Sequence, residues 1–437
     1  NIENTVFDVE LNELKSSSKD FNNIQFGEML ANVKLPELLH SLGEISAKAD
    51  FKGLLHNFKA NAEISTKIGN VNIKGASIRE NINENITYQA NIKSNHFDIG
   101  KFLGVKMIGS GVIDVDAKAK VGDLKELKCE LLANLSNFNI NGNNYNSIEI
   151  EGEMNEGVVS AQCDIIDNAA VINLNCEMDM LNNMSLVLRG DLNEVNLQKM
   201  NFFSFPDTTT LISTDIIARL NGFNLDSLRG FIDFRNAMIS TQTKNYDIDY
   251  LNIRTRNDST ANTLSLNSNI FSFVTEGQYN ICSLVSNITH IIDKYIPDFS
   301  LLSSKQENTK PITKEETIHL ANDKINLKLE VKDFATLSEL FALNMNIAPQ
   351  TTLTANISPE QDLNLNLHSD YFVYDSYIFE DISLLSQTKY DIFKSHLKVN
   401  KIRRSDSLSI DANDLILDFT KNDIALSLKA GMSENDK

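Results

Sequence analysis

The side chains that could carry out chemistry are scattered through this chain of 437 residues. The seven histidines are His40, His56, His96, His290, His319, His368 and His396. None of them forms the H-x-H or H-E-x-x-H spacing that a zinc site needs. The four cysteines are Cys129, Cys163, Cys176 and Cys282. They form no C-x-x-C pair, which argues against zinc ribbons and thioredoxin-type redox sites. We therefore expect neither a metal nor another cofactor.

Two of the cysteines flank a turn-like Asp167-Asn168. A hairpin that closes there would set Cys163 opposite about Ile172, several residues from Cys176. At ~3.3 Å per residue this separation is too long for a disulfide. We interpret all four cysteines as small apolar residues.

Motifs for nucleophilic catalysis and phosphate binding are also missing. The sequence contains no G-x-S-x-G, no P-loop and no Rossmann glycine fingerprint. Gly109-Ser110-Gly111 is better interpreted as the start of a strand, because no apolar strand-to-helix context surrounds it. Asp114 and Asp116 lie at strand spacing and are predicted to point into solvent, whereas a catalytic dyad needs a desolvated carboxyl. The sequence therefore predicts a protein that is not an enzyme.

Composition narrows the class further. Apolar residues make up 42% and charged residues 23% of the chain, which is typical of a globular or repeat protein. The net charge of −19 disfavours nucleic acid as a partner, because phosphate binding needs a basic surface. Only six prolines occur, as long paired strands require. No run of 18 apolar residues is present, so no membrane-spanning helix is predicted.

The clearest local pattern lies between Gly109 and Leu127. There Ile113, Val115, Ala117, Ala119 and Val121 alternate with charged residues. A period of two predicts a strand with one apolar and one charged face. Similar alternation recurs along the chain, for example at 325–331 and 363–367. Short helices are predicted at 35–42, 97–103, 195–200, 283–295 and 334–343.

An internal repeat is visible in one common register. Asp114, Ala117, Leu124, Leu127 and Asn144-Tyr145 reappear 101 residues later as Asp215, Ala218, Leu225, Leu228 and Asn245-Tyr246. A period of this size predicts a repeat architecture. The expected domains are repeated modules within 1–302 (approximate units 35–93, 97–190 and 195–300), a polar linker at 303–316 and a further module at 317–437.

The predicted fold class is all-β with short helices. A long row of half-apolar strands must cover its apolar face. One solution is a second sheet, as in sandwiches. The other is a long, curved, mostly antiparallel repeat sheet that folds into a groove, with the short helices capping or crossing it. The alternation serves both solutions, so it does not separate them.

A family resemblance favours the groove. The order of FDIGKFLG, GSGVIDVDAKAKVGDL and NFNINGNNYNSIEIEGE resembles the AsmA-like family, especially TamB-type proteins. The resemblance is clearest over 97–153, weaker at 195–254 and 35–93, and a matter of pattern alone at 325–430. It implies a repeating β-groove bridge in the periplasm that moves phospholipid from the inner to the outer membrane and serves envelope assembly. It also implies an inner-membrane helix before Asn1, which is not in this chain, and an outer-membrane barrel partner.

The groove hypothesis assigns acyl-chain contact to the inward-facing residues. These are Ile113, Val115, Ala117, Ala119, Val121, Ile148, Ile150, Ile216, Ala218, Leu220, Leu327, Leu329, Leu363, Leu365 and Leu367. For each of them, plain core packing is the alternative. Two other functions remain open: a structural scaffold or adhesin of tandem β-sandwiches, and a chaperone-like role in outer-membrane protein assembly, in which sheet edges pair with a client strand.

Overall fold

The structure is a computed structural model, and the features below concern the residues that it describes. These are residues 5–17, 40–54, 56–79, 85–120, 127–181, 184–222, 228–257, 261–280, 324–358, 363–389, 392–404, 409–419 and 424–431. The chain divides into two compact units. Unit 1 consists of Asn1–Ile217 with Ile239–Asn245, and unit 2 consists of Ala218–Met238 with Tyr246–Lys437.

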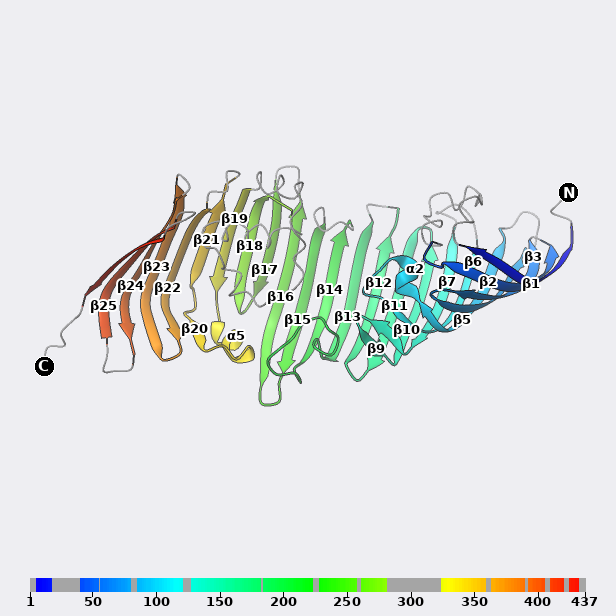
Figure 1. The fold of residues 1–437 in the computed structure, drawn as a ribbon, viewed down its shortest axis with the longest axis horizontal. Coiled ribbons are helices and arrows are strands. Elements are labelled where there is room, and N and C mark those ends of the chain that lie inside the picture. Colours follow the sequence, from blue (N-terminus) through cyan, green and yellow to red (C-terminus); the bar gives the residue numbers. More distant parts are fainter. Residues whose placement is uncertain are drawn as a thin grey trace. The chain divides into compact units, whose positions relative to one another are not determined.

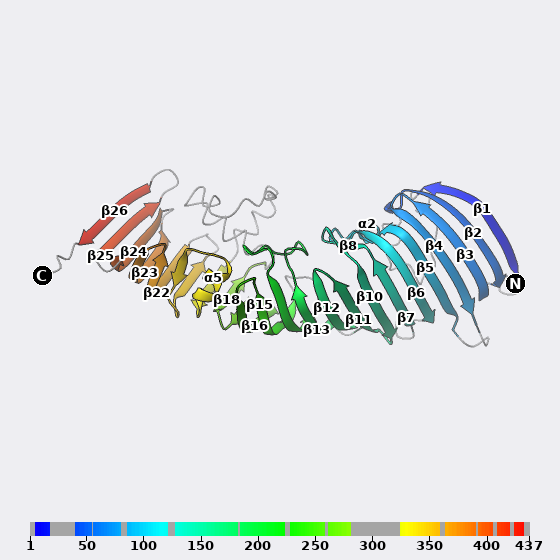
Figure 2. The same ribbon diagram turned by 90° about the horizontal axis from the view of Figure 1, so that it is seen from below.

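Unit 1 is built around an antiparallel sheet in which consecutive strands pair (Figure 1). The strands are β1 (Phe7–Ser17), β2 (Glu44–Leu54), β3 (Asn57–Thr66), β4 (Gly69–Ile78), β5 (Thr87–Asp98), β6 (Ser110–Lys120), β7 (Lys128–Ser136), β10 (Ser147–Asn155), β11 (Val158–Asp167), β12 (Ala170–Asp179) and β13 (Ser185–Val195). The first strands of this sheet are bowed along their length (Figure 2).

Three small elements accompany the sheet of unit 1. The helix α2 (Ile99–Leu103) joins β5 to β6, and β8 (Phe138–Ile140) pairs with β9 (Asn143–Tyr145) in a separate hairpin. Both lie at one end of β6 and β7 (Figure 2). The main core cluster of the unit forms where they meet the sheet, around Phe138 and Tyr145.

Unit 2 contains a second run of antiparallel strands. They are β16 (Asn245–Asn257), β17 (Asn262–Ser268), β18 (Phe271–Gln278), β19 (Lys324–Val331), β21 (Thr352–Ile357), β22 (Leu363–Tyr374), β23 (Tyr377–Lys389), β24 (Ile392–Arg403), β25 (Ser409–Phe419) and β26 (Ile424–Gly431). The helix α5 (Phe334–Leu340) precedes the short β20 (Met345–Ile347), which pairs with β22. Two further strands, β14 (Leu211–Asn221) and β15 (Arg229–Ser240), contain boundaries between the units, and a third boundary follows the first residue of β16.

The all-β class with short helices is confirmed, and each unit is a curved antiparallel sheet. The sequence repeat is also visible in the elements, because β14 begins and ends 101 residues after β6. The predicted helices at 97–103 and 334–343 correspond to α2 and α5. The predicted helix at 283–295 and the linker at 303–316 lie outside the described residues, as does most of the helix predicted at 35–42.

The third predicted helix, at 195–200, is a single helical turn in which the Met200 N–H donates to the Asn196 carbonyl at 3.1 Å. All three short elements start in the same way. A side-chain oxygen of Asp98, Asn196 or Asp333 accepts the backbone N–H three residues later, at 2.8, 2.9 and 3.4 Å. This cap satisfies a donor that the helix itself leaves unpaired.

The hairpin between β11 and β12 differs in register from the expectation. Cys163 lies opposite Leu174, not Ile172, because the chain reverses between Asp167 and Ala170. Cys176 lies opposite Ala161, so the two cysteines are diagonal neighbours on adjacent strands. Diagonal pairs are ~7–8 Å apart, too far for a disulfide. Cys129, Cys163 and Cys176 are all free, and Cys282 lies outside the described residues.

Candidate functional site

Ladder register aligns the apolar residues of unit 1 into rows that run across its strands. One row consists of Leu11, Ala49, Ala62, Ile73, Ile92, Val115, Ala133, Ile150, Cys163, Leu174 and Gly190. The next row consists of Val9, Phe51, Ala60, Gly75, Ala90, Ala117, Leu131, Gly152, Ala161, Cys176 and Leu188. The third consists of Phe7, Gly53, Phe58, Ser77, Tyr88, Ala119, Cys129, Met154, Val159, Met178 and Leu186. These three rows contain no charged residue, and together we call them the apolar face of unit 1.

The residues between these positions point to the other side of the sheet, because side chains alternate along a strand. They form the polar face of unit 1. One of its rows runs through Glu10, Asp50, Asn61, Lys74, Asn91, Asp116, Leu132, Glu151, Gln162, Asn175 and Arg189. Ion pairs such as Lys93–Asp114 at 2.8 Å connect neighbouring strands there. Their hydrogen bond and opposite charge lower the pKa of Asp114 and raise that of Lys93.

One end of the apolar side is closed and the rest is open. Ile113 and Ile148 belong to a fourth row, next to that of Val115, where α2 and the β8–β9 hairpin cover the strands. Their side chains are buried, at 7% and 2% exposed. In the other three rows nearly every residue is half-buried, although no second sheet covers them among the described residues. Within the described residues, the apolar face is therefore covered at one end only, which is consistent with a groove.

Aromatic side chains lean together on the first strands of unit 1, where the rows begin. The rings of Phe7, Phe51 and Phe58 follow one another across β1, β2 and β3, with centroids 6.4 and 4.7 Å apart. Phe58 and Tyr88 also approach to 6.4 Å, although β4 lies between their strands. Strands two positions apart are ~9.6 Å from each other, so side chains on this face converge.

Unit 2 has a similar apolar face. Its central row consists of Ile253, Leu266, Phe273, Leu329, Leu353, Leu367, Leu384 and Leu397. All of them are half-buried. On one side, Ile325, Ile357, Leu363 and Phe393 are buried and pack with Tyr279. The row between the central row and these buried residues contains hydroxyl side chains. Two of them, Ser386 and Ser395, form a hydrogen bond of 2.8 Å with each other.

The predicted lining residues fall into two groups by burial. The half-buried ones are Val115, Ala117, Ala119, Ile150, Ile216, Leu220, Leu327, Leu329, Leu365 and Leu367. The buried ones are Ile113, Ile148, Ala218 and Leu363. Ladder register places Ile148 in the row of Ile113 and Ile150 in that of Val115. Val121 lies outside the described residues. Contact with a ligand stays a prediction for the half-buried group, whereas the buried group packs inside the protein.

Residues that the sequence did not single out complete both faces. They include Phe51, Phe58 and Tyr88 in unit 1, and Leu353, Leu384 and Leu397 in unit 2. The alternation of apolar and polar residues along each strand predicts which face of the sheet these side chains occupy. However, only the ladder register shows that they continue the rows of Ala117, Ala119 and Leu329.

Three thiols lie on the apolar face of unit 1, one in each row. Burial raises the pKa of Cys129, Cys163 and Cys176, and the charge of Asp164 adds to the effect at Cys163. A raised pKa leaves little thiolate at neutral pH, and thiolate is the nucleophile and metal ligand. These side chains therefore serve the face as small apolar groups, as the sequence predicted.

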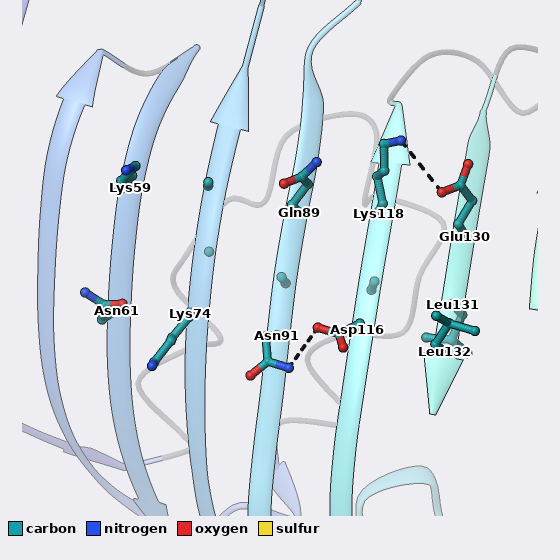
Figure 3. Close-up of a pocket in the computed structure, with 14 residues that line it drawn as sticks. Lys59, Asn61, Lys74, Gln89, Asn91, Asp116, Lys118, Glu130, Leu131 and Leu132 are labelled. Atoms are coloured by element: carbon teal, nitrogen blue, oxygen red, sulfur yellow. Dashed lines mark hydrogen bonds and ion pairs between the residues drawn. The ribbon is translucent and has the colours of Figure 1, made fainter. Parts of the chain in front are cut away.

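Hollows also occur on the polar face, where small residues leave space between long side chains. In Figure 3, Lys59, Lys74 and Lys118 stand around one such hollow. Lys118 pairs with Glu130 at 3.7 Å, and the Asn91 amide donates to Asp116 at 2.8 Å. These groups are solvent-exposed and of mixed charge, so the hollow lacks the desolvation that tunes a catalytic group.

Metal and membrane-helix sites are not found within the described ranges. No group of three or more His, Cys, Asp or Glu side chains is placed to hold a metal ion there. No helix among these residues is both long and apolar enough to cross a membrane. The fold and its faces thus define a class, an all-β repeat protein with open apolar sheet faces. Comparison with known proteins finds no matching family model, curated protein or solved structure.

Proposed function

We propose that this chain binds the acyl chains of lipids along its apolar sheet faces and acts without covalent chemistry as a lipid-transfer segment. The observation that supports the proposal is the set of uncharged, half-buried rows that no described residue covers. Monomeric proteins rarely leave contiguous apolar surface of this kind exposed unless it binds something. A lipid tail is a fitting occupant, because the rows offer contact without hydrogen-bond partners.

The dimensions suit more than one lipid. The eleven paired strands of unit 1, at ~4.8 Å each, give rows roughly 50 Å long. An acyl chain spans only about half of the ~30 Å bilayer core. Each methylene that leaves water contributes about 0.8 kcal/mol, so ten methylenes against the face contribute roughly 8 kcal/mol. Head groups stay at the wet opening, since burying their charge is costly.

We further propose that the lipid is phospholipid and that transfer runs from the inner to the outer membrane of a bacterial envelope. Only the resemblance of 97–153 to TamB-type proteins supports this location, along with the periplasm, an inner-membrane anchor and an outer-membrane barrel partner. Fractionation of cells that express the full-length protein tests it. Recovery of the protein from the cytoplasm alone would contradict it.

Lipid binding itself is tested by native mass spectrometry of the purified chain after gentle extraction. Ala117→Asp places a charge on the apolar face of unit 1 and is expected to reduce bound phospholipid severalfold. Ala76 is the matched control, since Ala76→Asp makes the same change on the polar face, opposite Lys59 and Gln89. Ala76→Asp should leave the bound lipid unchanged.

Unit 2 offers a more closely matched pair of variants, at two adjacent leucines of β23. Leu384 lies in the apolar row, whereas its neighbour Leu385 points to the other face and is 56% exposed. Leu384→Asp should reduce bound lipid and Leu385→Asp should not, with circular dichroism as the check that both variants fold. The proposal would be contradicted if each apolar-face variant lost no more lipid than its polar-face control. A wild-type chain without lipid adducts would also contradict it. Unfolding of both Ala117→Asp and Leu384→Asp would instead favour closed sandwich cores.

A further inference from the structure

Three short segments of unit 1 form one connected structure, which we call the cap. They are residues 99–109, 138–146 and 196–206. The Gly109 N–H donates to the Asn139 carbonyl at 2.9 Å. The Asn141 side chain donates to the carbonyl of Asn201 at 2.8 Å, and the Asn201 side chain donates back to the Asn141 carbonyl at 2.8 Å. A backbone hydrogen bond therefore joins the first segment to the second, and two asparagine side chains join the second to the third.

The cap has an apolar inner side and an apolar outer side. Phe138, Tyr145 and Met200 point inward and are 3%, 1% and 7% exposed. The outer apolar residues are Leu103, Val105, Met107, Phe202 and Phe203, each between 42% and 49% exposed. Closing the end of the sheet requires only the inner set. The outer set thus lies on a surface that the fold of unit 1 leaves open.

The charge of the cap is opposite to that of the chain. Its three segments contain Lys101, Lys106 and Lys199 and no Asp or Glu, although the chain has 59 acidic and 40 basic residues. Asp98, just before the cap, pairs with Lys101 at 2.9 Å. Lys106 and Lys199 are exposed and have no ion-pair partner within the described part of the chain. An anionic partner therefore fits this surface.

We propose that the cap docks unit 1 on an anionic lipid surface. The exposed apolar side chains come from separate turns, a shape that suits insertion among deformable head groups better than a flat protein interface. Lys106 lies between Val105 and Met107, where its stem covers apolar surface while its ammonium reaches lipid phosphates. This docking is independent of acyl-chain binding on the sheet faces.

The chain contains no tryptophan, so one substitution creates a site-specific reporter. Phe203→Trp is expected to show a fluorescence blue shift with vesicles of phosphatidylglycerol and phosphatidylcholine. The shift should weaken with phosphatidylcholine alone and with added salt, because head-group charge is then absent or screened. The control is Leu132→Trp, at an exposed position on the polar face of β7, and it should show no shift.

Vesicle co-sedimentation then separates the contribution of charge to vesicle binding from the contribution of apolar contact. Each lysine near an anionic surface contributes about a fivefold factor in affinity, so Lys106→Gln with Lys199→Gln should lose roughly 25-fold. Phe202→Ser should also weaken binding, while Ala76→Asp, on the polar face and outside the cap, should bind vesicles like the wild type. Undiminished binding of the double lysine variant, or an equal shift in Leu132→Trp, would overturn the proposal. A blue shift that depends on protein concentration without vesicles would overturn it in favour of a second copy of the chain.

Discussion

The three cysteines on the apolar face of unit 1 are the residues whose chemistry can report on that face. Cys129, Cys163 and Cys176 occupy positions in three different rows and add no charge to them. Burial raises the pKa of each thiol above its ordinary value of 9.0. They are therefore expected to react slowly at neutral pH, which makes them native probes of the face.

Thiol labelling gives a residue-scale prediction. In a Cys282→Ser background, maleimide should react with the three thiols more slowly than with a free cysteine at neutral pH. The rate should rise about tenfold per pH unit below the raised pKa, because thiolate is the reactive form. Preloading with phospholipid should slow the reaction further at every pH.

The measurement is mass spectrometry of labelled peptides over time. A preloaded sample that reacts as fast as a lipid-free sample would place the lipid away from these rows. The control for head-group effects is a water-soluble phosphate ester, which should leave the rate of maleimide labelling unchanged.

The capped helix α2 is one of the elements that close the end of the sheet in unit 1. In α2, burial works to raise the pKa of Asp98, but hydrogen bonds from the Lys101 backbone and side chain hold that pKa below its ordinary value of 3.8. A lowered pKa means that the charged form stabilises the fold. This stabilisation is present above pH 3.8 and is lost as the pH falls through the folded-state pKa.

Asp98→Ala should therefore loosen α2. Loss of a cap costs about 1 kcal/mol, so amide hydrogen exchange within 99–109 should be roughly fivefold faster at neutral pH. The difference from the wild type should narrow as the pH falls below 3.8. Asp98→Asn keeps a side-chain acceptor and should exchange almost like the wild type, and equal acceleration in both variants would argue against a capping role.

Strands and capped helices were the elements that the sequence predicted best. Alternation at Ile113 through Ala119 identified β6 because a strand's two faces show directly in its sequence. The turn register at Asp167 was predicted two residues off for Cys163, since hairpin register depends on which backbone groups pair across the turn.

At the scale of the whole molecule, each unit presents its own apolar face. If both faces bind acyl chains, native mass spectrometry should show more than one phospholipid per chain. Ala117→Asp and Leu384→Asp should each remove part of this load, and their combination should remove most of it, because independent sites act additively. The number of phospholipids bound per chain should depend little on salt concentration, whereas docking through the cap should weaken as salt is added.

Loss of all lipid in either single variant would contradict independent faces. It would indicate instead that lipids enter through one unit only. The Ala76→Asp and Leu385→Asp combination is the matched control, and its lipid count should equal that of the wild type.

The sequence by itself determined which side of each strand is apolar, since side chains alternate with a fixed period of two. It also determined the repeat of 101 residues and the positions of α2 and α5. Only the tertiary structure decided that Ile113 is buried while Ala117, on the same face of the same strand, is half-buried. The physical reason is that burial depends on what lies above the strand, and the cluster around Phe138 and Tyr145 includes Ile113 but not Ala117.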